Sequence, residues 1–425
     1  MVKTSRKKTA TNFLSLASVE LLNFLLPLIT MPYLIMVLGV KNYGLNSFVQ
    51  AVMQYFIIVT NYGFNISATQ EISVNREDKE KVEQIYTNVM TCKVLLTLAC
   101  FGILLLMMTF IPKMNQDPKL YLCMFGIVVG SVFLPVWFFQ GMEEMASIGV
   151  LNFVSKSIFT VGLFIFVKSP ADIYAVGILN SLGYLTIGVI ATLIVRYKYG
   201  IHYRKPSKTG IISQFKSSWY LFLSTLATSV YNTTNIFVLG LVAGDTATGY
   251  FNLANTLIRV CASVATPIVQ TFYPKVTQLI QTSKEDSLKL IQKIWLVVTV
   301  LFTLGCVILL VGSGPVLTWL FQDKFSHSVR LIQIMAFLPL MVAWSNVFGV
   351  MTMTTFGYQR ELSRIYLVTG LISLVSIILL TVTFKETGTA VNAILIETIV
   401  TISMYLFLQK KGIQVPKGQL KERVK

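Results

Sequence analysis

The stretch RYKYGIHYRKPSKTGIISQFK, residues 196–216, decides how this chain is organised. It is the longest polar stretch between two apolar runs, and it carries six lysine and arginine residues. A basic segment flanked by apolar runs is typical of a cytoplasmic loop in a membrane protein. We therefore expect it to separate an N-terminal half, residues 1–205, from a C-terminal half, residues 206–425.

The composition of the chain excludes an ordinary soluble fold. Of the 425 residues, 54% are hydrophobic and only 12% are charged, and the mean hydropathy is +0.70. Soluble domains carry about twice that share of charged residues. The net charge of +17 lies mainly in loops between apolar runs, which argues against nucleic acid as a partner. These properties predict an all-α polytopic membrane protein whose surroundings are the lipid bilayer.

Apolar runs long enough to cross a bilayer recur along the whole chain. A helix needs roughly 20 apolar residues to span the hydrocarbon core. By this measure about twelve runs are candidate transmembrane helices, approximately residues 12–39, 44–65, 84–111, 119–140, 146–167, 173–195, 217–242, 249–279, 289–312, 329–356, 364–384 and 387–409. The first run is too long for the apolar core of a signal peptide, so we expect it to be retained.

Lysine and arginine alternate between the two sides of the predicted bundle. Loops on one side, together with both termini, hold 25 of the 35 bases, and loops on the other side hold seven. Basic residues collect in cytoplasmic loops, so both termini are expected in the cytoplasm. The remaining bases, Lys93, Lys156 and Arg259, fall inside predicted spans.

A short sequence repeat supports the division into halves. YGLNSFVQAV at 43–52 aligns with TGYFNLANTL at 248–257, at an offset of 205 residues, and Gly44 meets Gly249. Two six-helix lobes that enter the membrane with the same orientation are related by a pseudo-two-fold axis along the membrane normal. Such lobes leave a central cleft, and their rocking gives alternating access.

Arg259 belongs to a polar stripe on the eighth predicted span. Asn252, Asn255, Ser263 and Thr266 recur with it at three- and four-residue steps, so all five lie on one helical face. A charge at the bilayer centre costs about 2.5–3.5 kcal/mol on insertion scales, so such a residue normally faces protein or water. The stripe therefore predicts a wet surface.

Shorter polar faces occur on other spans in both halves. The fifth span has Asn152, Lys156 and Thr160, the second has Asn46, Gln50 and Gln54, and the seventh has Tyr231, Asn232 and Asn235. We expect a substrate in the cleft to contact Arg259, Lys156, Lys93, Asn255, Asn152, Gln54, Tyr231 and Asn235. The alternative for the neutral residues is hydrogen bonding between helices.

The charges inside the predicted spans allow more than one interpretation. Lys93 lies about nine residues from the cytoplasmic start of its span, so its alternative is snorkelling towards the cytoplasmic interface. For Lys156 and Arg259 the alternative is an ion pair with Glu20 or Glu397, the acids predicted within spans. We favour a solvated anion site for these two bases. Either acid could pair with a base or carry a coupling cation.

The sequence shows no catalytic or metal-binding pattern. It has no Walker motif, no candidate serine, histidine and aspartate triad, and no long outer loop. The five cysteines lie in apolar runs without regular spacing, and the two histidines, His202 and His327, lie in predicted loops. We therefore expect neither an enzyme nor a metal site, and no cofactor.

Three stretches resemble a known family. They are MPYLIMVLGVKNYG from Met31, NYGFNISATQEISVNR from Asn61 and NIFVLGLVAGDTATGYFNLANTLI from Asn235. They are similar to Wzx-type polysaccharide repeat-unit flippases, which belong to the superfamily of multidrug, oligosaccharidyl-lipid and polysaccharide exporters. The family often has a base where this chain has Met36 and Gln70, so no role of those bases carries over.

The resemblance implies a V-shaped bundle of two six-helix lobes in the bacterial inner membrane. Such proteins move an undecaprenyl-diphosphate-linked oligosaccharide from the cytoplasmic to the periplasmic leaflet, for O-antigen in lipopolysaccharide or for capsule. Family members have cationic cavities, and Lys156 and Arg259 suit that role here. A Na⁺ or H⁺ gradient is the candidate energy source. A polysaccharide polymerase and a chain-length regulator are candidate protein partners.

Three alternatives compete with this function. A multidrug exporter of the same fold usually takes cationic substrates and favours an acidic cavity, whereas the charges inside the spans are mainly basic here. A membrane polymerase or glycosyltransferase needs a large outer loop or a catalytic pair of acids, and the sequence shows neither. A flippase for a teichoic-acid or peptidoglycan precursor carries similar chemistry, and the sequence barely separates it from the favoured function.

Overall fold

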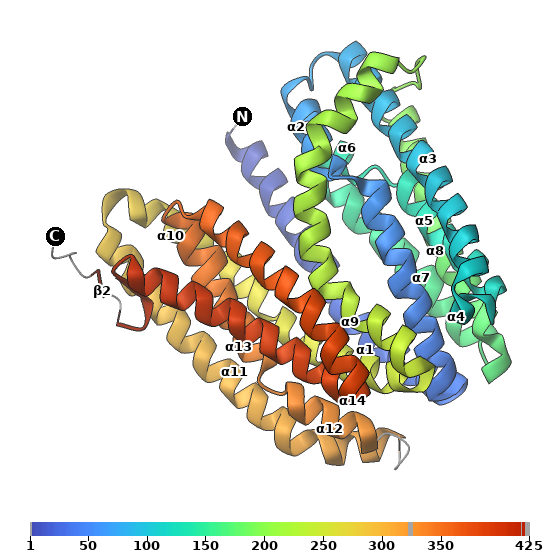
Figure 1. Ribbon diagram of the computed structural model, residues 1–425. Helices are drawn as coiled ribbons and strands as arrows, with labels where there is room; N and C mark the ends of the chain where they lie inside the picture. The colour runs from blue at the N-terminus through green and yellow to red at the C-terminus, as the bar shows by residue number, and fades with distance from the viewer. Residues whose placement is uncertain (1, 322–325, 418, 421–425) are drawn as a thin grey trace. The chain divides into compact units, whose positions relative to one another are not determined.

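The computed structural model of the chain is almost entirely helical (Figure 1). It describes the backbone of residues 2–321, 326–417 and 419–420, and the side chains of residues 26, 28–144, 147–223, 225–226, 233–319 and 326–417. The first helices are α1 (Val2–Asn61), α2 (Phe64–Val74), α3 (Lys79–Phe110), α4 (Pro112–Asn115), α5 (Pro118–Phe133), α6 (Val136–Gly141), α7 (Met145–Phe166), η1 (Pro170–Asp172) and α8 (Ile173–Tyr197). After these come α9 (Lys208–Ser263), α10 (Ala265–Thr282), α11 (Lys284–Phe321), α12 (Ser326–Met335), α13 (Leu338–Ser345), η3 (Asn346–Met353) and α14 (Gln359–Lys410). A short antiparallel pair, β1 (Ile413–Gln414) and β2 (Gln419–Leu420), flanks η4 (Val415–Lys417) near the C-terminus.

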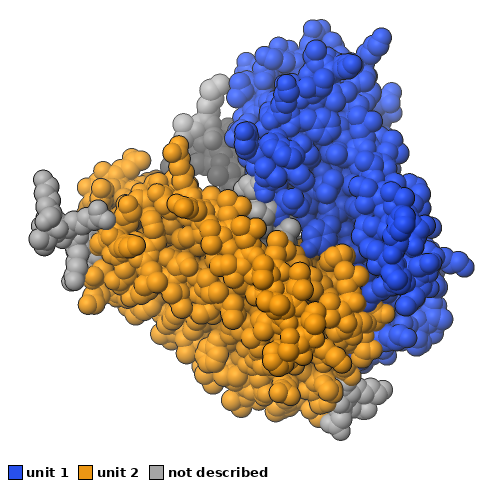
Figure 2. Space-filling view, viewed as in Figure 1, with its two compact units in different colours: residues 1–229 blue, residues 230–425 orange. Residues whose placement is uncertain are grey.

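Two compact units make up the chain, and they are coloured blue and orange in Figure 2. Unit 1 is Met1–Ser229 and unit 2 is Val230–Lys425, so the boundary falls inside α9. The sequence predicts a boundary between residues 205 and 206, about 24 residues earlier in the chain. The difference arises because the first turns of α9 pack within unit 1. Ser218 Oγ lies 2.7 Å from Ser67 Oγ of α2, and both residues are buried.

Within the described part of the chain, nine helical segments are long and apolar enough to cross a membrane. The three longest contain 47, 50 and 52 residues, more than twice what one crossing needs. Each contains a break in α1, α9 or α14, at Gly39, Gly244 and Lys385, where the backbone leaves the helical region and joins two helices. Dividing the three segments at these breaks agrees with about twelve spans. The exact count, the pseudo-two-fold axis and the V-shaped cavity stay predictions.

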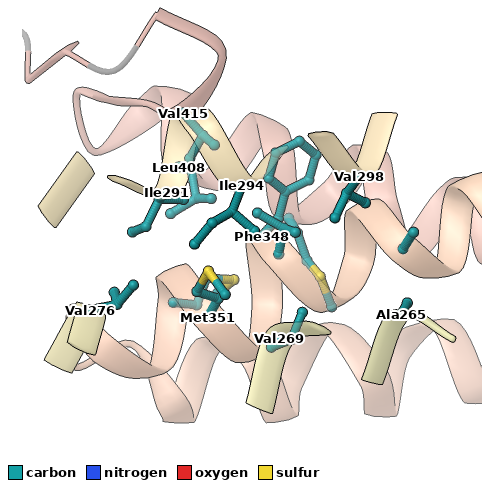
Figure 3. Close-up of a cluster of buried hydrophobic side chains, with 14 of the residues drawn as sticks. Ala265, Val269, Val276, Ile291, Ile294, Val298, Phe348, Met351, Leu408 and Val415 are labelled. Atoms are coloured by element: carbon teal, nitrogen blue, oxygen red, sulfur yellow. The ribbon is translucent and has the colours of Figure 1, made fainter. Parts of the chain in front are cut away.

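Each unit has its own apolar core. In unit 1, Phe64, Trp137 and Phe138 are fully buried among α2, α3, α6 and α8. In unit 2 the core is formed by α10, α11, η3 and α14, and Figure 3 shows side chains such as Val269, Ile294 and Phe348 converging between these helices. The two cores hold the helices of each unit together. The polar residues lie on helix faces that these cores do not use.

Small residues bring α5 and α8 close together in unit 1. A Cβ atom added to Gly130 of α5 would lie 2.4 Å from the carbonyl carbon of Tyr184 in α8. No real side chain fits at that distance, so this helix contact requires glycine. Close approach through small residues is a common way for membrane helices to associate. The contact at Gly130 places α8, with Tyr184, directly against α5.

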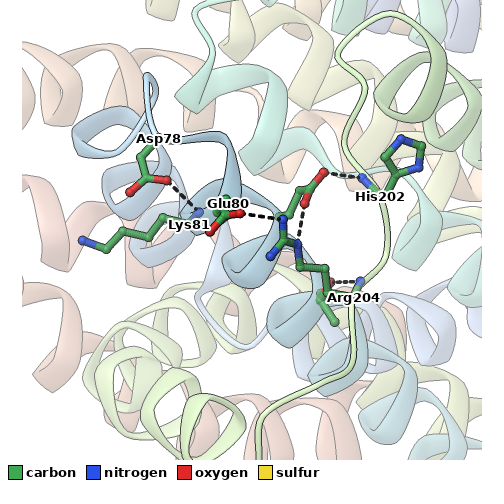
Figure 4. Close-up of polar contacts among 7 residues, drawn as sticks. Asp78, Glu80, Lys81, His202 and Arg204 are labelled. Carbon is green, nitrogen blue, oxygen red and sulfur yellow. Dashed lines mark hydrogen bonds and ion pairs between the residues drawn. The ribbon is translucent and has the colours of Figure 1, made fainter.

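The loop between α8 and α9 is fastened to the first turns of α3 (Figure 4). Glu83 accepts a hydrogen bond from Arg204 Nε at 2.5 Å and another from the His202 backbone N–H at 3.1 Å. One turn further along α3, Thr87 Oγ1 accepts the Arg204 backbone N–H at 2.9 Å, and Asn88 Oδ1 accepts the Ser207 N–H at 3.2 Å. We call this set of contacts between α3 and residues 202–207 the α3 clasp.

The loop between α8 and α9 is shorter in the structure than the sequence predicts. Segment 196–216 is predicted as a loop, but only residues 198–207 lie outside helices. Glu80 adds a second carboxylate 3.5 Å from Arg204 Nη2. The hydrogen bond to Glu83 and the charges of both carboxylates raise the pKa of the Arg204 guanidinium. Arg204, a base that the sequence assigns to this loop, is therefore held against α3.

Candidate functional site

A polar cavity of about 340 Å³ lies in unit 1, where α1, α5, α7 and α8 meet. Four side-chain amides line it, from Gln50, Gln54, Asn152 and Asn180. Lys156 is the charged residue among the described residues of its wall. The volume is near the lower end of the range for small-molecule sites, so the cavity has room for a small polar group and not for a complete oligosaccharide.

The helical periodicity of α7 places three predicted residues on the cavity wall. Asn152, Lys156 and Thr160 are four residues apart, and Ser155 and Phe159 lie between them on the same face. All five line the cavity. The sequence therefore predicts correctly that these polar residues share a face, although their role in binding a substrate stays a prediction.

The second part of α1, after the break at Gly39, supplies another section of the wall. Gln50 and Gln54 line the cavity together with Met53 and Ile57, as their spacing predicts. Asn46, which the sequence assigns to the same face, is buried instead, with 2% of its surface exposed. Its predicted stripe is thus divided between the cavity and the helix packing.

Two polar lining residues were missed by the sequence analysis. Asn180 and Tyr184 of α8 are four residues apart and both reach the cavity. The signal was present in YAVGILNSLGY, residues 174–184, where an asparagine and a tyrosine share a helical face. A single asparagine in an apolar span does not by itself distinguish a cavity wall from helix packing.

Hydrogen-bond capacity remains unused on the cavity wall. Asn152 donates through Nδ2 to the carbonyl of Ile148, 3.0 Å away on its own helix. Thr160 Oγ1 is buried and has no hydrogen-bond partner among the described atoms. Buried polar atoms are normally satisfied by protein, water or ligand. With Lys156, these groups can bind a polar solute that carries hydroxyl groups and a negative charge.

Unit 2 carries the other base of the prediction. Arg259 of α9 is exposed, and its Nε donates a 3.2 Å hydrogen bond to Asn255 Oδ1 one turn earlier. Asn255 is buried, with 6% of its surface exposed, so its contact holds the Arg259 guanidinium against the same helix. Arg259 and Asn255 thus lie on one face of α9, as the sequence predicts.

Asn235 and Glu397 lie in buried hydrogen-bonded contacts of unit 2. Asn235 Oδ1 accepts from Asn392 Nδ2 at 3.2 Å, and Asn392 Oδ1 accepts from Ser376 Oγ at 2.6 Å. Glu397 accepts from Ser345 Oγ at 2.9 Å and is 7% exposed. For Asn235 this corresponds to the alternative of hydrogen bonding between helices. The contacts together join α9, α13 and both parts of α14.

The other predicted site residues lie apart from the cavity or beyond the described side chains. Lys93 is 1% exposed, and its Nζ donates a 3.1 Å hydrogen bond to Asn61 Oδ1, so it packs inside unit 1 instead of lining the cavity. This placement differs from snorkelling to an interface. The side chains of Glu20 and Tyr231 lie outside the described residues.

No group of three or more histidine, cysteine, aspartate or glutamate residues in the described ranges could hold a metal ion. All five cysteines are free thiols, and Cys92, Cys100 and Cys306 are buried. The described wall of the cavity offers one ammonium group, amides and hydroxyls for contact with a solute.

The helices, the cavity and the polar faces define a multi-pass helical membrane protein. Solved structures share this fold over nearly the whole chain. A lipid II flippase MurJ in an inward closed conformation matches with a TM-score of 0.70 and 11% identity, covering 95% of this chain and 87% of that one. An inward-facing multidrug resistance MATE transporter of the MOP superfamily matches with a TM-score of 0.62 and 16% identity, covering 95% and 99%.

Sequence comparison defines the family more narrowly. The polysaccharide biosynthesis protein family matches residues 9–280, so this chain belongs to that family. An Escherichia coli K12 protein named "Putative O-antigen transporter" is 31% identical over 414 residues, which are 97% of this chain and 100% of that protein. The predicted fold class, an all-α polytopic membrane protein, and the predicted family resemblance are both confirmed.

Proposed function

We propose that this protein is a flippase for a lipid-linked polysaccharide precursor. The observation that carries the proposal is the cavity of unit 1, where Lys156 lies among four amides on a membrane-embedded wall. The family and the name of the Escherichia coli relative support a role in assembling a surface polysaccharide such as O-antigen. We infer a transporter and not an enzyme.

The proposed cargo is an oligosaccharide linked to undecaprenyl diphosphate, which passes from the cytoplasmic to the periplasmic leaflet of the inner membrane. A diphosphate carries about two negative charges, and moving it bare through hydrocarbon is prohibitively costly. Lys156 and Arg259 each supply a cation that can offset this cost. Gln50, Gln54 and Asn180 can exchange hydrogen bonds with sugar hydroxyls while the prenyl tail stays in lipid.

The proposed cycle is alternating access, in which the cargo site opens to one leaflet and then to the other. A Na⁺ or H⁺ gradient is the energy source we propose, and Glu20 and Glu397 are the acids proposed to take part in coupling. Glu397 already accepts a hydrogen bond from Ser345, so a change in its charge would also change a helix contact. The hydrogen bond between α13 and α14 therefore connects the charge of Glu397 to a helix contact, which supports its proposed role in coupling.

A second candidate cargo is a peptidoglycan lipid precursor. The favouring observation is that the MurJ lipid II flippase has the higher TM-score of the two structures compared, 0.70 against 0.62. Its identity of 11% shows the fold alone. Expression in a cell depleted of its own lipid II flippase decides this case, because growth would be restored only if that precursor is carried.

The principal experiment replaces the gene with variants and measures surface polymer and lipid-linked repeat units. Lys156→Met and Arg259→Met are expected to remain in the membrane but to lose polymer, with repeat units accumulating on the cytoplasmic side. Lys205→Met is the matched control, because Lys205 is an exposed base of the loop after α8. Normal polymer in both site variants would overturn the proposed cationic site.

A further inference from the structure

A second cavity system of unit 1 faces away from the polar cavity, along α3 and α5. An apolar groove of about 340 Å³ is lined by Val94, Leu98 and Phe101 of α3 and by Val129 and Phe133 of α5, among others. The one hydroxyl on its wall, that of Thr97, is used within α3, where it donates to the Lys93 carbonyl at 2.7 Å. The groove therefore offers no hydrogen bonds and suits a hydrocarbon chain.

A polar pocket of about 400 Å³ continues the groove at one end. The two share Val94 and Phe133 in their walls, so they form one track. The pocket adds Tyr86 of α3, Arg196 at the end of α8, and His202 of the following loop. This end of α8 is the one that the distribution of basic residues predicts to be cytoplasmic.

The length of the track matches one leaflet. Along α3 it extends from Tyr86 in the pocket to Phe101 in the groove, which is about 22 Å at 1.5 Å per residue. Half of a bilayer's hydrocarbon core is about 15 Å thick, and a headgroup layer lies outside it. The apolar part thus lies at the depth of acyl chains, and the polar part lies at the depth of headgroups.

The polar pocket has the chemistry of a phosphate site. Arg196 is exposed and has no carboxylate within 4.0 Å among the described side chains, while its guanidinium lies 5.8 Å from the Tyr197 ring centroid. Figure 4 shows the His202 ring directed away from Arg204. The Tyr86 hydroxyl on the pocket wall has no hydrogen-bond partner among the described atoms. Cation and hydroxyl are therefore available to an anionic headgroup.

We propose that this track binds one anionic glycerophospholipid of the membrane, with an acyl chain in the α3 and α5 groove and the phosphodiester at Arg196. Basic pockets beside membrane helices are known to recognise anionic headgroups in this way. A phosphodiester carries one negative charge, which matches one arginine. The doubly charged diphosphate of a carrier lipid would need more positive charge than the described wall supplies. The site is distinct from the cavity around Lys156, so it does not depend on the proposed cargo.

Native mass spectrometry of the purified full-length protein tests the proposal. Phosphatidylglycerol and phosphatidylethanolamine with identical acyl chains are added separately, and undecaprenyl phosphate is added as a competitor. We expect preferential retention of one phosphatidylglycerol. We expect Arg196→Ala to weaken it about fivefold, since a basic residue at a membrane surface contributes about 1 kcal/mol to anionic lipid binding. Arg360→Ala, which removes an exposed arginine of unit 2, is expected to retain the lipid.

A second variant tests the groove independently of charge. Val129→Trp fills the groove and is expected to weaken retention of phosphatidylglycerol, whereas Leu122→Trp, on the same helix but outside the groove, is expected to leave it unchanged. Equal retention of the two phospholipids by the wild type would overturn the proposal. Unchanged binding by both Arg196→Ala and Val129→Trp would do the same. Displacement by undecaprenyl phosphate at equal concentration would assign the track to the carrier lipid instead.

Discussion

Gly39 and Gly244 adopt nearly the same left-handed backbone conformation, 205 residues apart in the chain. Gly39 has φ 74° and ψ 167°, and Gly244 has φ 83° and ψ −174°. Each joins two helices, and their separation equals the offset of the repeated stretches 43–52 and 248–257. This backbone region is essentially restricted to glycine. The two halves therefore share a helix junction as well as a sequence pattern.

Replacing either junction glycine with alanine should destabilise the fold. Neither Gly39 nor Gly244 has an atom within 4 Å of an added Cβ, so the penalty is conformational and not steric. We expect a loss of about 1–3 kcal/mol, seen as a lower thermal unfolding temperature in detergent. The control is Gly305→Ala, whose site inside α11 is equally open, and it should be neutral or stabilising. Equal stability of all three variants would contradict the junction role.

The amides of the cavity should matter less to transport than its charge. A neutral hydrogen bond contributes about 0.5–1.5 kcal/mol and one to a charged group about 1.5–3 kcal/mol. We expect Gln54→Leu or Asn180→Leu to slow flipping about 2–10-fold and Lys156→Met about 10–100-fold. The rate is measured as transfer of a lipid-linked oligosaccharide between leaflets of reconstituted vesicles. Gln116→Leu, an exposed glutamine outside the cavity, is the control, and a loss as large as that of Gln54→Leu would refute a specific role for the amides.

The Asn392 amide should stabilise unit 2 without binding cargo. It is 1% exposed and connects Asn235 with Ser376, so Asn392→Ala leaves two polar groups without this partner. We expect a loss of about 1–2 kcal/mol in unfolding free energy. Thr383→Ala is the control, since Thr383 is exposed on the same helix and bonds to its own backbone. Residual transport per folded molecule should equal that of wild type, and a transport defect at normal stability would show that this amide has a functional role.

The α3 clasp should depend on Glu83 more than on Glu80. The side chain of Glu83 is 5% exposed and accepts two hydrogen bonds from the loop, whereas Glu80 is 82% exposed and lies 3.5 Å from Arg204. We expect Glu83→Gln to lower the unfolding temperature by a few degrees and to open residues 198–207 to protease, because it weakens a buried contact. Exposed ion pairs such as that of Glu80 add little stability. Glu80→Gln should change neither property. Identical protease sensitivity in the two variants would assign no special role to Glu83.

The sequence predicted the fold to the extent that helical periodicity and hydropathy determine it. The stripe of Asn152, Lys156 and Thr160 follows from a repeat of four, and the structure places all three on one wall. The unit boundary inside α9 does not follow from composition. It depends on single contacts such as Ser218 with Ser67, which are 151 residues apart and carry no local signal.

The candidate site was predicted in part for the same reason. A helical face shows which residues lie together, but not whether they meet a cavity or another helix. Gln54 reaches the cavity, while Asn235 is buried against Asn392, although both are amides on predicted polar faces. Only the packing of neighbouring helices separates these two cases, and that packing is a property of residues far away in the chain.

The two parts of the α3 clasp are synthesised at different times. Arg204 follows Glu83 by 121 residues, so at 5–20 residues per second α3 leaves the ribosome roughly 6–24 s before the segment that fastens to it. The residues of α3 that hold the loop are therefore synthesised first, and the start of α9 can dock on them before most of unit 2 has been translated. A chain whose synthesis stops near residue 216 already contains every partner of that clasp. Docking at this stage would let the second half insert from an end that is already held.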